Sequence, residues 1–276
     1  MAQQSFDRRR VNGPEESFPP IFADEEIRSS LLEDGKRRDG RSLDELRPIF
    51  LTTGLISQAN GSAYIETGNT KIAVAVYAPR QLKNTQYSET GRLNVEVKFA
   101  PFSSIKRRAP LRDVEDRAIG QLVHQSLLPA IQLHLFPKSS IDVFITVIEN
   151  DGLEGCVASA SMAASTALAD AGIEMQGIVV ACSAAVNQGR IILDPLTSEA
   201  ASSQGRLILA GLPALGTITN LWQSGSLSAE DVLHCIDTCH NRFKDLHDVI
   251  IDALTQSNRA KQAATLAENV QSKSIK

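Results

Sequence analysis

Two segments with helical periodicity, each followed by a β-type run, constrain the fold of this chain more than any other feature. Apolar residues recur near helical spacing over 114–128, and a β-type run over 141–148 follows. A second helix is predicted over about 157–171, because Gly172 stands in a C-cap position, and the strand 178–185 comes next. A helix followed by a strand, twice in succession, predicts a mixed sheet backed by helices.

The chain before these helices consists largely of short β-type runs. Strands are expected over 51–57 and 62–66, on either side of the turn signal Asn60-Gly61, and then over 71–77 and 93–99. The last of these runs alternates apolar and polar side chains, as a sheet with one solvated face does. This part is predicted to be a β-meander, and the fold class is α+β, with mixed β-sheets packed against α-helices.

Beyond residue 185 the sequence predicts one more pair of strands and a long helix. The runs 207–212 and 217–222 have the character of paired strands. Ser228 with Asp231 resembles the capping arrangement that opens a helix, and this helix is expected to run to about Leu254.

The number of domains is inferred from whether the sequence contains linker-like segments. No Pro/Gly/Ser-rich stretch divides residues 41–256, so one domain is expected there. Residues 1–40 carry clustered charges of both signs without periodicity and are predicted to be an extended arm, which is either disordered or lies along the body of the protein or a neighbour. Residues 257–276 are expected to form a polar C-terminal tail.

Composition excludes several classes of function. The 28 Lys+Arg and 32 Asp+Glu give a net charge of -4, so a nucleic acid cannot be gripped by overall charge and any such contact must be local. Aromatic residues are 5 % of the chain, which leaves little material for stacking nucleobases. No apolar run approaches the roughly 20 residues that span a bilayer, and no apolar signal segment opens the chain, so a soluble, intracellular protein is expected. The 4 cysteines form no CxxC motif, which is typical of reduced thiols in the cytosol or nucleus.

The sequence His234-Cys235-x3-Cys239-His240 raises the possibility of a zinc site, because such residues at i and i+4 share a helix face. No second ligand pair accompanies it, and Cys239 continues an apolar stripe that includes Phe243. The buried-stripe interpretation is therefore favoured, and no metal or cofactor is expected.

Cys156 lies near the predicted start of the second helix, where free N–H groups and the helix dipole would lower the pKa of a thiol. A nucleophile also needs a base, and the sequence brings no histidine next to Cys156, so a helix-packing role is favoured. The nearby Gly152-x-x-Gly155 lacks the Lys-Ser/Thr pair of a phosphate-binding loop and predicts no nucleotide site.

Charge is unevenly distributed along the chain. Residues 80–117 hold nine Lys/Arg against five acidic residues, with the run Lys106-Arg107-Arg108. Two interpretations remain open for this segment, a solvated loop or a local contact with a phosphate backbone. Residues 142–204, in contrast, contain eight acidic residues and one basic residue.

Several longer motifs carry a resemblance to a known family. In chain order they are RRDGRSLDELRPI, GSAYIETGNTKIAVAVYAPR, APFSSIKRRAP, LFPKSSIDVFITVIENDG and STALADAGIEM. Together they resemble the RNase PH family, over about residues 37–254, and within that family they are most similar to ring subunits of the eukaryotic RNA exosome core. The resemblance implies an RNase PH-like fold.

Active members of this family degrade RNA from its 3′ end by phosphorolysis, so the resemblance implies a site that holds two anions. The family's Gly-Gly-Ser/Thr-Arg phosphate loop falls on Glu154, Gly155, Cys156 and Val157, which lack the hydroxyl and the arginine. A carboxylate at 154 would repel phosphate by like charge. The family's two catalytic aspartates fall on Ala200 and Arg206, neither of which is a carboxylate. A subunit without phosphorolytic activity is therefore expected.

The alternative is an active phosphorolytic 3′-5′ exoribonuclease whose site is shared with a partner or rearranged around Asp151, Glu199 and Arg206. Under either hypothesis the resemblance implies other RNase PH-like ring subunits, RNA-binding cap subunits, an associated exosome nuclease and RNA as partners, and a location in nucleus, nucleolus and cytoplasm. The family's RNA-gripping arginine pair aligns near Val114 and Glu115. The candidate contacts to the RNA backbone are Arg80, Lys83, Lys106, Arg107, Arg108 and Arg112. These cations are alternatively expected to pair with acidic surfaces of a neighbouring subunit.

Overall fold

The computed structural model describes residues 32–33, 36–37, 39–81, 87–104, 107–108 and 114–274. Most of the expected N-terminal arm lies outside these ranges. Three of the candidate RNA-contacting residues, Lys83, Lys106 and Arg112, also lie outside the described residues.

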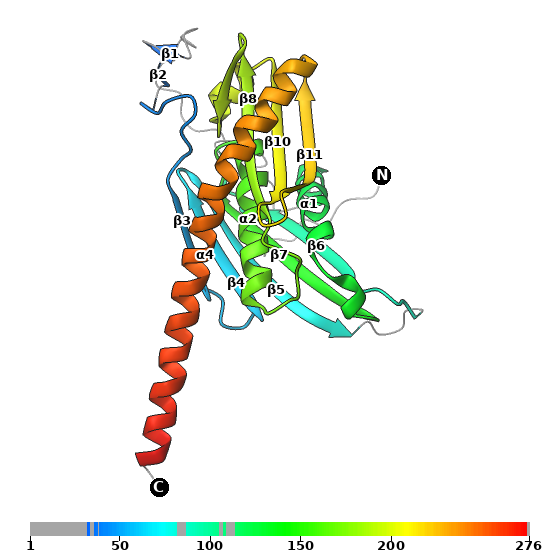
Figure 1. The fold of residues 1–276 in the computed structure, drawn as a ribbon, viewed down its shortest axis with the longest axis vertical. Helices are drawn as coiled ribbons and strands as arrows, with labels where there is room; N and C mark the ends of the chain where they lie inside the picture. The colour runs from blue at the N-terminus through cyan, green and yellow to red at the C-terminus, as the bar shows by residue number, and fades with distance from the viewer. Residues whose placement is uncertain are drawn as a thin grey trace, which may run out of the picture.

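A five-stranded sheet forms the first half of the molecule (Figure 1). Its order is β3-β4-β5-β7-β6, and its strands span Ile49–Thr53 (β3), Gly61–Thr67 (β4), Thr70–Gln81 (β5), Ser139–Glu149 (β7) and Arg92–Phe99 (β6). The first three strands are a meander, as predicted. The fourth strand in sequence is not part of it, because β7 pairs with β5 and β6 runs parallel to β7 at the sheet edge. A parallel pair needs a crossover, and the helix α1, Val114–Leu127, lies in the β6-to-β7 connection.

A four-stranded antiparallel sheet forms the second half, in the order β11-β10-β8-β9. The strands are Thr217–Gly225 (β11), Gly205–Leu212 (β10), Val180–Asn187 (β8) and Arg190–Leu193 (β9). The predicted pairing of β10 with β11 is confirmed. The short β9 and the short helix α3, Thr197–Ser202, were not predicted, because segments of 4 and 6 residues carry little periodicity.

The helix α2, Leu153–Asp170, connects the two sheets, packing against β4 and β5 of the first and β8 and β10 of the second (Figure 1). Its sequence is rich in Ala and Ser, and nearly every residue of it is buried. Small side chains let the neighbouring backbone approach closely. A Cβ on Gly61 of β4 would come 2.3 Å from the carbonyl oxygen of Ala167.

The helix α4, Ala229–Ser274, packs on the four-stranded sheet and then projects beyond both sheets (Figure 1). The capping arrangement at its start is confirmed, since the Asp231 N–H donates to Ser228 Oγ over 3.1 Å. The predicted end near Leu254 is wrong, because the helix continues to Ser274. Past Leu254 the sequence is polar on most sides, so periodicity gave no sign that the helix continues.

One hydrophobic core runs through both sheets. In the five-stranded sheet, Ile65, Ile72 and Ile145 are each no more than 1 % exposed. In the four-stranded sheet, Leu207 and Leu209 of β10 are 0 % exposed and continue the same core. Among the described residues, no helix is long and apolar enough to cross a membrane.

Candidate functional site

The positions at which the resemblance predicts a degenerate phosphate site converge at the first turn of α2. The chain turns through Gly152, whose φ of 126° favours glycine, and α2 begins at the next residue. This puts Glu154 in the first turn, between the two sheets, with 1 % of its surface exposed. Arg206 reaches it from β10, and its Nη1 lies 2.9 Å from Glu154 Oε1. The family resemblance predicted that both positions lack the family's functional residues. In the structure these two residues form one ion pair.

The electrostatics of this pair oppose the binding of a second anion. The N-terminus of a helix favours a negative charge, and in the 18-residue α2 the buried carboxylate of Glu154 already lies in the first turn. Arg206 neutralises that carboxylate and is not a free cation. Its side chain is 36 % exposed, so the pair faces solvent on the arginine side only.

Cys156 and Val157 have a packing role. They are 0 % and 1 % exposed, and burial raises the pKa of the Cys156 thiol to about 12, although the charge of Arg108 acts in the opposite direction. A thiol with this pKa is protonated at neutral pH and cannot act as a nucleophile. The helix-packing interpretation of Cys156 is confirmed by its complete burial.

The residues of the rearranged-site alternative each have a partner in the structure. Ala200 is buried in α3 beside Glu199, and both Glu199 oxygens accept hydrogen bonds from Arg37, Nε at 2.8 Å and Nη2 at 2.5 Å. Asp151 Oδ2 lies 3.6 Å from Arg47 Nη1, and Asp151 Oδ1 accepts from Thr197 Oγ1 over 3.3 Å. These carboxylates are bound to neighbouring side chains of the same chain.

The sequence analysis missed a buried ion-pair network beside these carboxylates. Arg47 donates to both oxygens of Asp194, Nε over 2.6 Å and Nη2 over 2.5 Å, and Arg41 Nη1 lies 3.7 Å from Asp194 Oδ2. Burial alone would lower the pKa of Arg47, but the hydrogen bond and the charge of Asp194 raise it overall. The arginine-rich motif RRDGRSLDELRPI and the later Leu193-Asp194 were the available signal, but their pairing joins segments far apart in sequence.

The two histidines and two cysteines of the candidate zinc motif in α4 differ in burial. Cys235 and Cys239 are 0 % exposed, whereas His234 and His240 are exposed. The buried-stripe interpretation is confirmed by the burial of the two cysteines together with Phe243. Over the described ranges, no three His, Cys, Asp or Glu side chains are arranged to hold a metal ion.

The candidate RNA-contacting residues that the structure describes differ in how exposed their side chains are and in their contacts within the chain. Arg80, at the end of β5, is 57 % exposed and its guanidinium lies 4.8 Å from the Tyr77 ring centroid. Arg107 is exposed. Arg108 is held within the chain, because its Nη2 lies 2.8 Å from Glu115 Oε2 and its guanidinium is 4.2 Å from the Phe99 ring centroid.

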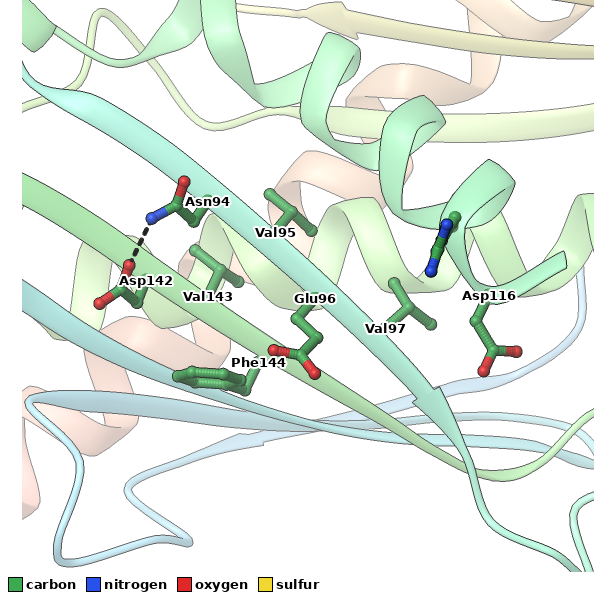
Figure 2. A pocket seen from close by; sticks show the side chains of 9 residues that line it. Asn94, Val95, Glu96, Val97, Asp116, Asp142, Val143 and Phe144 are labelled. Atoms are coloured by element: carbon green, nitrogen blue, oxygen red, sulfur yellow. Dashed lines mark hydrogen bonds between the residues drawn. The ribbon is translucent and has the colours of Figure 1, made fainter. Parts of the chain in front are cut away.

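A groove of about 440 Å³ lies along β6, β7 and the start of α1 (Figure 2). Asn94 donates to Asp142 Oδ1 over 2.8 Å within it, and the ring of Phe144 lies exposed beside Glu96. Three carboxylates line it, from Glu96, Asp116 and Asp142, against the single guanidinium of Arg117. This lining is unfavourable for a phosphodiester backbone, and none of its residues belongs to the Glu154–Arg206 pair.

Two family models match the chain in succession. The model described as the 3′ exoribonuclease family, domain 1, covers residues 45–174, and domain 2 of the same family covers residues 177–242. The chain belongs to the RNase PH family. Its five-stranded sheet with α1 and α2 makes up the first of the two matched regions, and the four-stranded sheet lies in the second.

The relatives of this RNase PH family member are named as exosome components. It is 34 % identical over 252 residues to the exosome complex component mtr3 of Schizosaccharomyces pombe, covering 90 % of this chain and 95 % of that protein. It is 40 % identical over 226 residues to the exosome complex component Rrp41 of Pyrococcus furiosus, covering 81 % and 90 % of the two chains. The structure of rice Rrp46 superposes with a TM-score of 0.69 at 24 % identity, covering 79 % of this chain and 100 % of that one. The expected RNase PH-like fold is confirmed.

Proposed function

We propose that this RNase PH family member is a non-catalytic structural subunit of the RNA exosome core ring. The names of its relatives, mtr3 and Rrp41 exosome components, support a place in that complex. In this role the chain forms part of the wall of a ring, and RNA passes through the ring during 3′-to-5′ processing and degradation. A missing protomer opens such a ring and exposes its interfaces, so an inert subunit is still required.

The single observation that carries the non-catalytic assignment is the ion pair between Glu154 and Arg206. Phosphorolysis brings an anionic nucleophile to an anionic RNA end, so a site for it needs cations and helix N–H groups that are free to bind two anions. Here the buried carboxylate takes the helix N-terminus and the arginine binds that carboxylate. The absence of a carboxylate at Ala200 removes a group for proton transfer or metal binding.

The partners in this proposal are the other RNase PH-like ring subunits, the RNA-binding cap subunits and the associated nuclease. The proposed locations are nucleus, nucleolus and cytoplasm, with ribosomal RNA among the processed RNAs. RNA contacts are to the backbone and come from the candidate cations, of which Arg80 and Arg107 have exposed side chains. The domain boundaries 1–40, 41–256 and 257–276 remain part of the proposal.

The test is a phosphorolysis assay on the purified, reconstituted ring with RNA and inorganic phosphate. Nucleoside diphosphate release is expected to be the same whether the ring holds the wild-type chain, the Arg206→Ala variant or the Asp151→Asn variant. The rival hypothesis, an active exoribonuclease with a shared or rearranged site, predicts release that is lost when Arg206 or Asp151 is changed. That loss, in rings of unchanged composition, would contradict the non-catalytic assignment.

A further inference from the structure

Besides a small sheet of two strands, Leu32–Glu33 (β1) and Lys36–Arg37 (β2), the described residues form the two larger sheets, which end in four edge strands, β3 and β6 on one and β9 and β11 on the other. An edge strand presents a row of backbone N–H and C=O groups that can pair with another chain. Folded proteins protect such edges with charged residues, proline, short strands or a covering element. The four edges of this chain can be compared on these terms.

Three of the four edges carry such protection. Strand β6 has Arg92, Glu96 and Lys98 among its 8 residues. Strand β9 is 4 residues long and begins with Arg190, and β3 is 5 residues long with α4 packed against it. These features are the ordinary means of keeping an edge from pairing.

Strand β11 has neither charge, proline nor short length, and α1 packs against the face that carries Asn220, whose Nδ2 donates to the Leu122 carbonyl oxygen over 3.2 Å. Leu221, the next residue, faces the opposite side of the sheet. The 9 residues of β11, TITNLWQSG, include no charged residue and no proline. Ile218 is 48 % exposed and Leu221 is 44 % exposed, and no strand of the described residues pairs with the side of β11 that faces away from β10. Figure 1 shows β11 as the outermost strand of its sheet.

A β-bulge brings the two exposed apolar side chains onto one face. Leu221 pairs with Leu209 and Ile218 pairs with Gly211, with the register shift between Ala210 and Gly211. Residues two apart on β10 face the same side, so their partners on β11 do so as well, although those partners are three apart. The result is an apolar strip along the free edge, which Leu215, 52 % exposed in the turn before β11, extends.

We propose that β11 is an interface strand that adds, edge to edge, to a β-strand of a neighbouring ring subunit. This inference rests on the proposed function. The partner strand is uncharged or apolar where it meets Ile218 and Leu221, because the edge offers it backbone hydrogen bonds and apolar side chains only. RNA does not fit this edge, since phosphate contacts need cations and β11 has none.

Hydrogen exchange tests strand addition directly. Amide exchange in residues 217–225 is compared by mass spectrometry between the isolated chain and the chain in the reconstituted ring. We expect the exchange of this segment to slow by about tenfold or more on assembly, because outward N–H groups gain partners. Unchanged exchange of β11 in an assembled ring overturns the inference and leaves the proposed function intact.

A pair of substitutions gives a second test. The variant with Ile218→Lys and Leu221→Lys changes side chains that are already about half exposed, so the fold is expected to persist, which thermal unfolding checks. Recovery of the variant in the ring, after coexpression with the ring subunits, is expected to fall about tenfold or more. Leu135→Lys is the matched control, since Leu135 is also 44 % exposed, and it should assemble normally.

The outcomes separate the two proposals. Wild-type recovery by the double-lysine variant, in a ring that contains the wild-type chain under the same conditions, contradicts the β11 interface alone. If the tagged wild-type chain purifies without any ring subunit, the proposed function is contradicted and the interface inference is overturned with it.

Discussion

The Glu154–Arg206 pair shows how two substitutions at distant positions stabilise each other. Glu154 is 1 % exposed, and a carboxylate in such a place needs a cation, which Arg206 supplies over 2.9 Å. Either residue alone would leave a buried or partly buried charge without a partner. Both residues were marked by the family resemblance, but only the folded chain brings β10 and α2 together.

A double-mutant cycle tests this mutual dependence. Arg206→Ala should lower the free energy of unfolding by about 2 kcal/mol, less than a fully buried pair would cost because the arginine is partly exposed. In a Glu154→Gln background the same change should cost under about 1 kcal/mol, because no buried charge is left unpaired. Urea denaturation of the four chains measures both costs. Equal costs in the two backgrounds would show that the pair does not couple.

The Cys156 thiol predicts a pH effect on stability. Burial raises its pKa to about 12 from an ordinary value of 9.0, so between these values the unfolded thiol loses its proton and the folded one keeps it. Stability should therefore fall as the pH rises above 9, with a slope for this group that approaches about 1.4 kcal/mol per pH unit once the unfolded thiol is fully ionised. At pH 9 the unfolded thiol is only half ionised, so the fall in the free energy of unfolding from pH 9 to pH 10, measured by urea denaturation, should be about 1 kcal/mol smaller in Cys156→Ala. Identical slopes in the two proteins would exclude the effect.

At the scale of elements, buried arginines join the start of the domain to the region around β9 and α3. Arg37 binds Glu199 and also donates to the carbonyl oxygen of Leu193 over 2.7 Å, while Arg47 binds Asp194. The backbone adds a further link, because the Leu193 N–H donates to the carbonyl oxygen of Leu43 over 2.9 Å. These contacts fix the segment before β3 against the four-stranded sheet.

Asp194→Asn is expected to weaken this junction. The change removes the carboxylate that Arg47, whose side chain is 5 % exposed, hydrogen-bonds, and leaves only Asp151 at 3.6 Å, at a cost of about 3 kcal/mol in the free energy of unfolding. Asp245→Asn is the control, because Asp245 is 63 % exposed and pairs with Arg242 over 3.4 Å, and its loss should cost under about 1 kcal/mol. Chemical denaturation measures both, and similar small costs would contradict a structural role for the network.

Sequence periodicity predicted the elements better than their arrangement. The strands 71–77 and 93–99 and the helix 114–128 were found because each has a regular apolar pattern. The pairing of β6 with β7 was missed, since strand order depends on contacts between distant segments. The start of α2 was expected near 157 and lies at Leu153, because the first turn contains Glu154 and Gly155 and has no apolar periodicity.

The candidate site was predictable only in part, for the same physical reason. The resemblance located the positions of the phosphate loop, which needs only local motifs. It did not predict that Arg206 would bind Glu154, nor that Arg108 would be held by Glu115. Such ion pairs form between residues that only the tertiary structure brings together.

At the scale of the whole molecule, the basic segment around residue 106 bears on the proposed passage of RNA. The variant with Lys106→Glu and Arg107→Glu should reduce RNA retention by the assembled ring and flatten its salt dependence, because fewer counterions are released. Filter binding over a salt series measures both. Ring composition must stay unchanged, and loss of assembly would instead assign this segment to a protein interface. Arg190→Glu, at an exposed arginine of β9 outside the basic run, is the control and should not weaken retention.

We expect this chain to hold no phosphate, because Glu154 and Arg206 occupy the place where phosphate would bind. Isothermal titration of inorganic phosphate into the assembled ring containing the wild-type chain, compared with a ring containing Arg206→Ala, measures this most directly. Identical isotherms are expected, with no phosphate binding that depends on Arg206. Saturable phosphate binding that disappears with Arg206→Ala would contradict this expectation.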